Sequence, residues 1–263
     1  MLEVRNLVLA HGRTTILSDV SFSVASGEVV ALCGPNGAGK STLLSALSGE
    51  MPPVSGAISI KGCDITGISA AQLAKCRAVL EQAPTLSATF DVRTLTSLSI
   101  PREVSPLEAN RITRDTLAEL DLTALSARPV HSLSGGQQHR VHLARTLAQL
   151  GAGRSLGGGD ALMLDEPTAS LDITHQITVM QAARRAAERG TAVIVVLHDL
   201  NLAAAFADRI VMLHKGGIAA KAPPAEVLTP SLLTGIYETE IAVSLIGDTP
   251  IVTPVYLPTE ARP

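Results

Sequence analysis

Gly34-Pro35-Asn36-Gly37-Ala38-Gly39-Lys40-Ser41 is the stretch that decides the fold of this chain. It fits the pattern G-x-x-x-x-G-K-[ST], in which backbone N–H groups converge on phosphate oxygens. The apolar run Val29–Cys33 precedes it, as expected of a strand buried on both faces, and Lys40–Leu47 is predicted to be a helix. This order of strand, glycine-rich loop and helix is the context that the motif requires, so a simple glycine-rich turn is the weaker interpretation.

The residue types of this loop predict its chemistry. Gly34, Gly37 and Gly39 allow a tight backbone path, and the dipole of the following helix favours an anion. Lys40 is expected to reach the β- and γ-phosphates of a nucleotide, and the Ser41 hydroxyl to ligate Mg²⁺. The predicted nucleotide-binding residues of the loop are Gly34, Pro35, Asn36, Gly37, Ala38, Gly39, Lys40, Ser41 and Thr42.

A second apolar strand ends in two carboxylates. Leu162-Met163-Leu164 leads into Asp165-Glu166, and a carboxylate at the end of such a strand is costly to bury without a cation. We therefore expect Asp165 to bind Mg²⁺, directly or through water. Glu166 lies one residue further and can face the γ-phosphate. The alternative is a solvated Asp-Glu pair that caps the turn before Pro167.

The third motif is Leu133-Ser134-Gly135-Gly136-Gln137, which precedes an amphipathic segment. Ser134 is therefore expected in the N-cap position of a helix. The helix end would offer free N–H groups and a positive dipole end to an anion. Ordinary helix capping is the alternative, although capping alone needs neither glycine.

In this order, the three motifs resemble those of the nucleotide-binding subunits of ATP-binding-cassette (ABC) transporters, over nearly the whole chain. The resemblance implies an α/β fold, with a RecA-like P-loop NTPase core, an N-terminal antiparallel β subdomain and an inserted α-helical subdomain. It implies ATP and Mg²⁺ as ligands, and Glu166 as the group that polarises the attacking water. It also implies a homodimer, in which Ser134, Gly135, Gly136 and Gln137 meet the γ-phosphate held by the opposing subunit.

Four further positions receive roles from this resemblance. His198 resembles the switch histidine at the γ-phosphate, and Gln82 resembles the glutamine that links Mg²⁺ and γ-phosphate to the transmembrane partner. Ser170-Leu171-Asp172 resembles the D-loop at the dimer interface. His11 stands where an aromatic residue usually stacks on adenine, and its imidazole offers less stacking area. The alternatives are a structural His198, an N-cap Asp172 and a solvated His11.

These assignments give the predicted site as a whole. The catalytic residues are Lys40, Gln82, Glu166 and His198, and the metal ligands are Ser41, Gln82 and Asp165. Besides the loop, the nucleotide is contacted by His11, Ser134, Gly135, Gly136, Gln137 and Asp172.

Sequence periodicity predicts a single domain with an insertion. Residues 2–8 and 16–24 alternate as half-buried strands do. In the insertion, Ser105-Pro106-Leu107-Glu108 predicts a capping box, and Leu107, Ile112, Leu117 and Leu120 recur at near-helical spacing. We expect residues 1–83 and 138–263 to form the core, and 84–137 to form the helical subdomain with the third motif, residues 133–137, which we call the signature motif. The other expected elements are helices 137–150 and 176–189, strands 161–164, 192–197, 210–214 and 218–220, a flexible loop 151–160 and a loose tail from Thr253.

Composition restricts the possible partners. With 17% charged residues and a net charge of −3, a broad nucleic-acid surface is not expected, and 2% aromatic residues offer few stacking platforms. The three cysteines Cys33, Cys63 and Cys76 fit no disulfide framework, which favours a reducing compartment. The N-terminus shows no secretory signal, and no apolar run approaches the about 20 residues of a membrane span. Membrane association would therefore come through a partner.

The branch of the family is predicted from finer likenesses. One cassette without a coiled coil indicates a separate subunit that joins membrane-spanning chains, as in bacterial importers. Four segments resemble importers of ferric siderophores, haem and vitamin B12: Leu147 to Leu150, Asp172 to Gln176, His198 to Leu202 and Ile246 to Val252. The glycine-rich segment before residue 161 is most like that of haem importers.

The sequence thus predicts the ATPase subunit of a haem importer, peripheral at the cytoplasmic face of the inner membrane. Its predicted partners are a second copy, two permease subunits and, indirectly, a periplasmic substrate-binding protein, with no nucleic acid. One alternative changes the cargo to ferric siderophore or cobalamin. Another is a regulatory module that binds ATP without hydrolysis, which the intact Lys40, Asp165, Glu166 and His198 disfavour. A P-loop kinase is a third alternative, but it would give the Ser134 motif no function.

Overall fold

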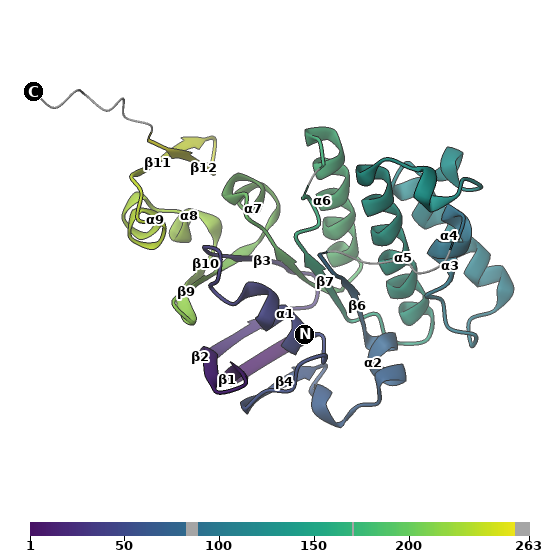
Figure 1. Cartoon of the computed structure of the whole chain (residues 1–263), viewed down its shortest axis with the longest axis horizontal. Coiled ribbons are helices and arrows are strands. Elements are labelled where there is room, and N and C mark those ends of the chain that lie inside the picture. Colours follow the sequence, from purple (N-terminus) through teal and green to yellow (C-terminus); the bar gives the residue numbers. More distant parts are fainter. Residues whose placement is uncertain (83–88, 170, 256–263) are drawn as a thin grey trace, which may run out of the picture.

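The computed structural model describes residues 1–82, 89–169 and 171–255. Its central sheet has six strands in the order β10-β9-β3-β8-β7-β6, which are parallel apart from the β9–β10 hairpin (Figure 1). The strands are β3 (Val29–Cys33), β6 (Arg77–Leu80), β7 (Ala161–Asp165), β8 (Ala192–Val196), β9 (Arg209–His214) and β10 (Gly217–Ala222). Every residue of β3, β7 and β8 is buried, which explains their continuous apolar sequences.

Alternate residues of these strands supply the cores on the two faces of the sheet. Val30 and Leu32 pack in one cluster with α1 (Lys40–Leu47), whereas Val29 and Ala31 pack in another with α6 (Ile173–Glu188) and α7 (Leu200–Phe206). Figure 1 shows α5, α6 and α7 on one side of the sheet and α1 on the other. The sheet is therefore the middle layer of an α/β fold.

A second, antiparallel sheet packs on the α1 side, in the order β2-β1-β4-β5. Its strands are β1 (Leu2–His11), β2 (Thr14–Val24), β4 (Ser55–Ile60) and β5 (Cys63–Asp64). The two strands predicted at the N-terminus are confirmed, and they extend to a tight turn. Gly12 makes this turn with a φ of 59°, a conformation that suits glycine.

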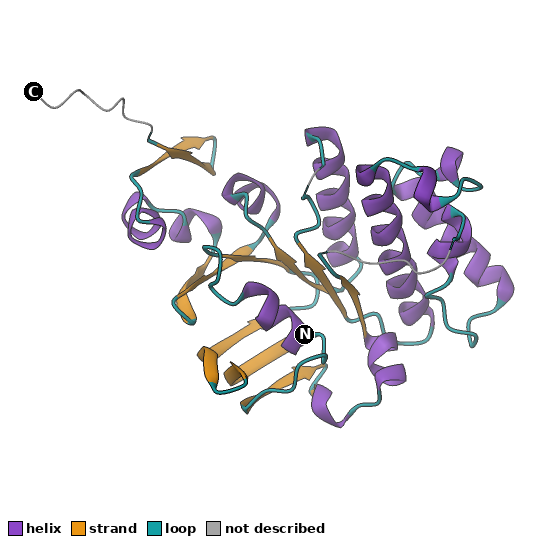
Figure 2. Ribbon diagram, viewed as in Figure 1, coloured by secondary structure: helices purple, strands orange, loops and turns teal. Residues whose placement is uncertain are grey.

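Helices dominate the segment that follows residue 89 (Figure 2). They are α3 (Val92–Ser97), α4 (Pro106–Glu119) and α5 (Gly135–Ser155), with the short turns η2 (Thr123–Leu125) and η3 (Val130–Ser132) between them. Helical structure in this segment was predicted. The subdomain boundaries at 84 and 137 stay a prediction, and residues 83–88 lie outside the described residues.

One residue of the predicted apolar face of α4 does not lie on the buried face of the helix. Ile112, Leu117 and Leu120 are buried, but Leu107 is 84% exposed. At 100° for each residue, Leu107 lies about 150° around the helix from the middle of the buried face that Ile112, Leu117 and Leu120 form. At the start of α4, the Ser105 hydroxyl accepts a hydrogen bond from the Glu108 N–H, and Pro106 occupies the first turn, as predicted. The predicted capping box is only half formed, because both carboxylate oxygens of Glu108 accept hydrogen bonds from Arg111.

Helix α5 runs beyond its predicted end at Leu150, so part of the predicted loop 151–160 is helical. The added turn contains Gly151 and Gly153. A Cβ atom at Gly153 would lie 2.3 Å from the carbonyl oxygen of Lys75 in α2 (Ala70–Cys76). Glycine thus allows the end of α5 to approach a neighbouring backbone, a tertiary reason that the sequence pattern did not show.

This close contact predicts a loss of stability in the Gly153→Ala variant. Alanine favours a helix by up to about 1 kcal/mol over glycine, but a rigid backbone oxygen at 2.3 Å must move to admit it. Overpacking of this kind costs about 1–3 kcal/mol. We therefore expect a lower Tm by differential scanning calorimetry, by about 2–4 °C for each kcal/mol lost. Gly135→Ala in the same helix is the control, since its Cβ would meet nothing within 4 Å; a Tm of Gly153→Ala equal to that of the control would contradict this explanation.

The C-terminal part adds short helices and a hairpin beyond β10. The predicted hairpin of β9 and β10 and the predicted helix α6 are confirmed, although α6 begins earlier, at Ile173. Thr253 and Pro254 belong to a strand, so the loose tail was predicted to begin too early. Residues 256–263 lie outside the described residues. The remaining elements are η1 (Ile65–Gly67), α8 (Pro224–Val227), α9 (Pro230–Tyr237), β11 (Ile241–Ile246) and β12 (Thr249–Pro254).

Candidate functional site

The glycine-rich loop joins β3 to α1 and holds a buried lysine. Lys40 is only 6% exposed, and its ammonium donates hydrogen bonds to the carbonyl oxygens of Gly34 (2.8 Å) and Pro35 (3.0 Å). An ammonium has three donors, so one is left for an anion. Burial lowers the pKa of Lys40, while the negative charges of Glu166 and Asp165 oppose that shift. The loop therefore presents a desolvated cation close to two carboxylates.

Glycines make this backbone path possible. Gly34 has a φ of 142°, and a Cβ atom there would lie 2.2 Å from the carbonyl oxygen of Leu213. Gly39 has a φ of 94° and packs against Leu17 of β2, where its Cβ would meet Cδ2 at 2.7 Å. Gly39 is also the N-cap of α1, and no side chain of the described residues caps this helix end. The first N–H groups of α1 thus lack a side-chain acceptor, as at an anion-binding helix terminus.

Asp165 ends β7 beside Ser41. Its side chain is buried, and its Oδ1 atom has no hydrogen-bond partner in the part of the chain that the structure describes. Burial raises the pKa of Asp165, and the nearby hydroxyl of Ser41 opposes that rise. A buried carboxylate oxygen without a partner, next to a hydroxyl, is a donor set that suits Mg²⁺.

This pair would be only part of a metal site. Among the described residues, no three His, Cys, Asp or Glu side chains lie close enough together to hold a metal ion. Mg²⁺ usually takes one or two carboxylates and completes its shell with waters and substrate phosphates. Asp165 and Ser41 therefore fit a Mg²⁺ that arrives with a nucleotide.

Glu166 lies at the centre of a three-residue cluster. One carboxylate oxygen accepts a hydrogen bond from the Gln82 amide at 2.9 Å, and the other lies 2.5 Å from Nε2 of His198. Gln82, Glu166 and His198 follow β6, β7 and β8, which are neighbours in the sheet. Glu166 also has a φ of 48°, a strained conformation for a residue with a side chain. The fold thus holds this carboxylate at the edge where the strands end.

Ser134 caps α5, as predicted. Its hydroxyl accepts a hydrogen bond from the Gln137 N–H, and the Gln137 side chain accepts one from the Ser134 N–H at 3.1 Å. Packing within the chain explains why residue 136 is a glycine, since a Cβ there would lie 3.2 Å from the Leu171 side chain. Gly135 is different, because a Cβ there would meet no atom of the described residues within 4 Å. The ordinary capping alternative is therefore present, but it leaves Gly135 unexplained.

Asp172 and His11 lie at the edges of this region. Asp172 is the N-cap of α6 and accepts a hydrogen bond from the His175 N–H at 2.9 Å, so its capping alternative is also present. His11 is exposed at the end of β1, opposite Thr14. Its hairpin continues into Leu17, which packs against Gly39 of the glycine-rich loop. Ser170 lies outside the described residues.

One contact at the site was not predicted. His139 lies in the first part of α5, and its Nε2 atom is 2.8 Å from the carbonyl oxygen of Pro167. Burial lowers the pKa of His139. The contact ties the helix capped by Ser134 to the residue that follows Glu166. Because 28 positions separate the two residues, no local sequence pattern could have revealed it.

Comparisons with known proteins identify the family of this chain. The family model described as ABC transporter matches residues 17–169. A hemin import ATP-binding protein HmuV of Nitrobacter winogradskyi is 41% identical over 258 residues, which cover 98% of this chain and 94% of that protein. The HmuV of Thermobifida fusca is 44% identical over 260 residues, with 97% and 89% covered.

Solved structures share the fold. An ATP binding subunit of an ABC transporter superposes with a TM-score of 0.76 at 26% identity, covering 86% of this chain and 91% of that one. A bacterial Atm1-family ABC exporter with ATP bound gives a TM-score of 0.74 at 27% identity, over 90% of this chain but 41% of the exporter. Within the described ranges, the chain has no helix with both the length and the apolar character needed to cross a membrane.

Proposed function

This chain belongs to the ABC transporter family, and we propose that it is the ATP-hydrolysing subunit of a bacterial importer of haem. The ATPase assignment depends chiefly on Glu166, which Gln82 and His198 hold beside a phosphate-binding loop. The cargo is inferred from relatives named for hemin import that align with nearly the whole chain.

Each of the site's side chains would have a separate role in hydrolysis. Lys40 would use its remaining donor for the β- and γ-phosphates, and the free N–H groups at the start of α1 would bind the same anion. Glu166 would accept a hydrogen bond from the attacking water and orient it, and His198 would contact the γ-phosphate. Gln82, which donates to Glu166, would report the state of the nucleotide to the permease. Mg²⁺ held by Ser41 and Asp165, with Gln82 nearby, would neutralise phosphate charge.

The signature motif would complete the site of a second copy. The glycine-rich loop binds the nucleotide of its own chain, so the capped end of α5 is left to meet another anion. Gly135 supports this assignment, because among the described residues no atom lies where its side chain would begin. In a homodimer, residues Ser134 to Gln137 and Asp172 would therefore approach the ATP of the partner. Two permease subunits would hold the dimer at the cytoplasmic face of the membrane, and a periplasmic binding protein would deliver the cargo.

Growth on haem tests the cargo. In a strain of the source organism that lacks this gene, we expect growth on hemin as the sole iron source to fail, and growth on ferric siderophore to continue. Wild-type protein should restore growth, whereas Lys40→Ala should not, because Lys40 is the buried phosphate-binding cation. Loss of growth on siderophore alone, or of cobalamin uptake alone, would instead establish the corresponding cargo. A strain that grows on hemin without the gene would contradict the proposal.

Base selectivity is a second test, directed at His11. An exposed imidazole offers less stacking area than a larger ring. We expect GTP to support turnover within roughly tenfold of ATP, since such stacking differences are about 1 kcal/mol. In a phosphate-release assay, His11→Tyr should increase the preference for ATP. Much stronger rejection of GTP by the wild type, unchanged in the variant, would show that another residue recognises the base.

A further inference from the structure

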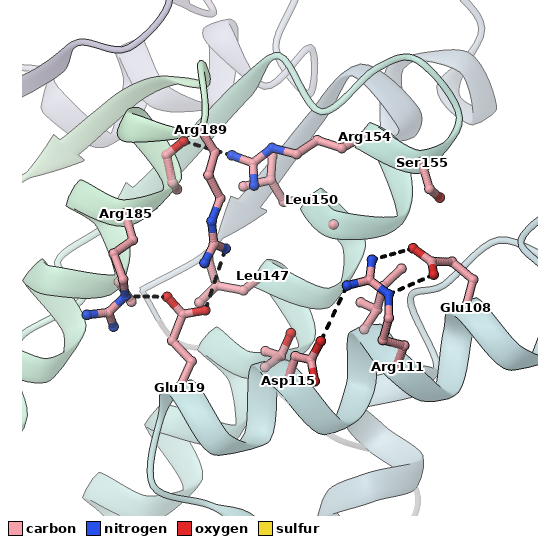
Figure 3. A pocket seen from close by; sticks show the side chains of 15 residues that line it. Glu108, Arg111, Asp115, Glu119, Leu147, Leu150, Arg154, Ser155, Arg185 and Arg189 are labelled. Atoms are coloured by element: carbon pink, nitrogen blue, oxygen red, sulfur yellow. Dashed lines mark hydrogen bonds and ion pairs between the residues drawn. The ribbon is translucent and has the colours of Figure 1, made fainter.

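A large cavity lies between α4, α5 and α6, apart from the nucleotide site (Figure 3). Its volume is about 870 Å³, which is in the range of small-molecule sites. No residue assigned above to ATP or Mg²⁺ lines it. Part of its wall is apolar, with the buried side chains of Ile112, Leu147 and Leu150.

The charges that line this cavity are unevenly balanced. At one end, Arg111 pairs with two carboxylates, Glu108 at 2.6 Å and Asp115 at 3.4 Å. At the other end are Arg154, Arg185 and Arg189, which we call the arginine cluster, and the single carboxylate of Glu119 (Figure 3). Three guanidinium groups against one carboxylate leave two positive charges at this end.

Contacts within the arginine cluster do not remove this excess. Arg185 takes the close ion pair with Glu119 at 2.7 Å, and Arg189 reaches the same carboxylate only at 3.9 Å. Arg154 donates to neutral oxygens, the carbonyl of Ala186 at 2.7 Å and the hydroxyl of Thr191 at 2.6 Å. Burial and the nearby charge of Arg189 lower the pKa of Arg154. The neighbouring cations therefore repel each other at this end of the cavity.

We propose that the arginine cluster binds a small phosphorylated anion. Guanidinium groups bind phosphate through paired hydrogen bonds, and they are less hydrated than an ammonium. A phosphate group presents three oxygens in different directions, which suits donors from two helices better than a planar carboxylate does. The anion would lie at the arginine cluster, between α5 and α6 and next to Glu119 of α4. It would thereby connect the helical segment to the helices that cover the central sheet.

Methyl NMR can test this site with inorganic pyrophosphate as the probe. Pyrophosphate should also bind the glycine-rich loop, so a signal that is specific to each site is needed. Leu147 and Leu150 line the cavity, whereas Leu43 and Leu44 follow Lys40 in α1. With leucine methyl groups labelled, we expect saturable shifts of the Leu147 and Leu150 signals, with an affinity that differs from that reported by Leu43 and Leu44. Shifts confined to Leu43 and Leu44 would overturn the proposal.

Three variants sharpen the test. Arg189→Gln should weaken binding at Leu147 and Leu150 by about tenfold or more, since a hydrogen bond to a charged group is lost. Glu119→Gln should tighten binding, because it frees Arg185 and Arg189. Arg102→Gln is the charge-matched control, exposed and outside the cavity lining, and should change neither signal. A merely structural cluster would give no increase in affinity for Glu119→Gln; that result, or equal effects of Arg189→Gln and Arg102→Gln, would refute the site.

Discussion

Replacing Glu166 with Gln is expected to stop ATP turnover and leave ATP binding intact. The amide is close in size to the carboxylate, so it can keep the contact with Gln82 and donate to Nε2 of His198. It cannot accept the proton of the attacking water. Loss of such a general base costs on the order of 10²–10⁴ in rate. A phosphate-release assay should therefore show this fall, while a fluorescent ATP analogue binds with unchanged affinity.

The same variant should accumulate an ATP-bound dimer, because the interface would form without being released by hydrolysis. Size-exclusion chromatography with ATP and Mg²⁺ would detect this species. Glu226→Gln, an exposed carboxylate on α8, is the matched control and should hydrolyse ATP normally. If Glu166→Gln turned over like this control, Glu166 would have no part in the reaction.

Local sequence signals predicted the centre of this fold well. Val29–Cys33 and Lys40–Leu47 have the predicted bounds, because burial on both faces and helix propensity act within a few neighbouring residues. Tertiary contacts decided what the sequence pattern missed. The last turn of α5 exists where glycine admits the Lys75 carbonyl, and Leu107 is exposed because its angular position, not its apolarity, decides its environment.

The candidate site shows the same division. Each motif, including the glycine-rich loop and the apolar strand that ends at Asp165, could be recognised from its own contiguous residues. The convergence of Gln82 and His198 on Glu166 depends on β6, β7 and β8 being neighbours, an order that spacing along the chain does not encode. The arginine cluster could not be predicted from the sequence for the same reason. Its residues come from α5 and from the end of α6, and they lie close together only because these helices pack against each other.

The remaining prediction concerns which chain supplies Ser134 to each ATP. A signature-motif variant and a Lys40→Ala variant should be inactive as separate homodimers and regain activity when mixed. Ser134→Arg removes the α5 cap, so Gly135→Arg is the better partner; it keeps the cap, and a Cβ at this position meets no atom of the described residues within 4 Å. If the motif acts across the interface, the mixed dimer has one doubly damaged site and one intact site. Random exchange should then restore about a quarter of the wild-type ATPase rate, since half of the dimers are mixed and each has one intact site of two.

A second mixture provides the control for this test. Lys40→Ala and Glu166→Gln both damage the site of their own chain, so their mixed dimer has no intact site and should stay inactive. Both mixtures need subunit exchange, which a crosslink between differently tagged copies can report. Only a shared site predicts that Lys40→Ala regains ATPase activity when mixed with Gly135→Arg and stays inactive when mixed with Glu166→Gln. The test assumes that one intact site can turn over alone. If crosslinked mixed dimers formed and both mixtures stayed inactive, the result would count against the shared site or against that assumption.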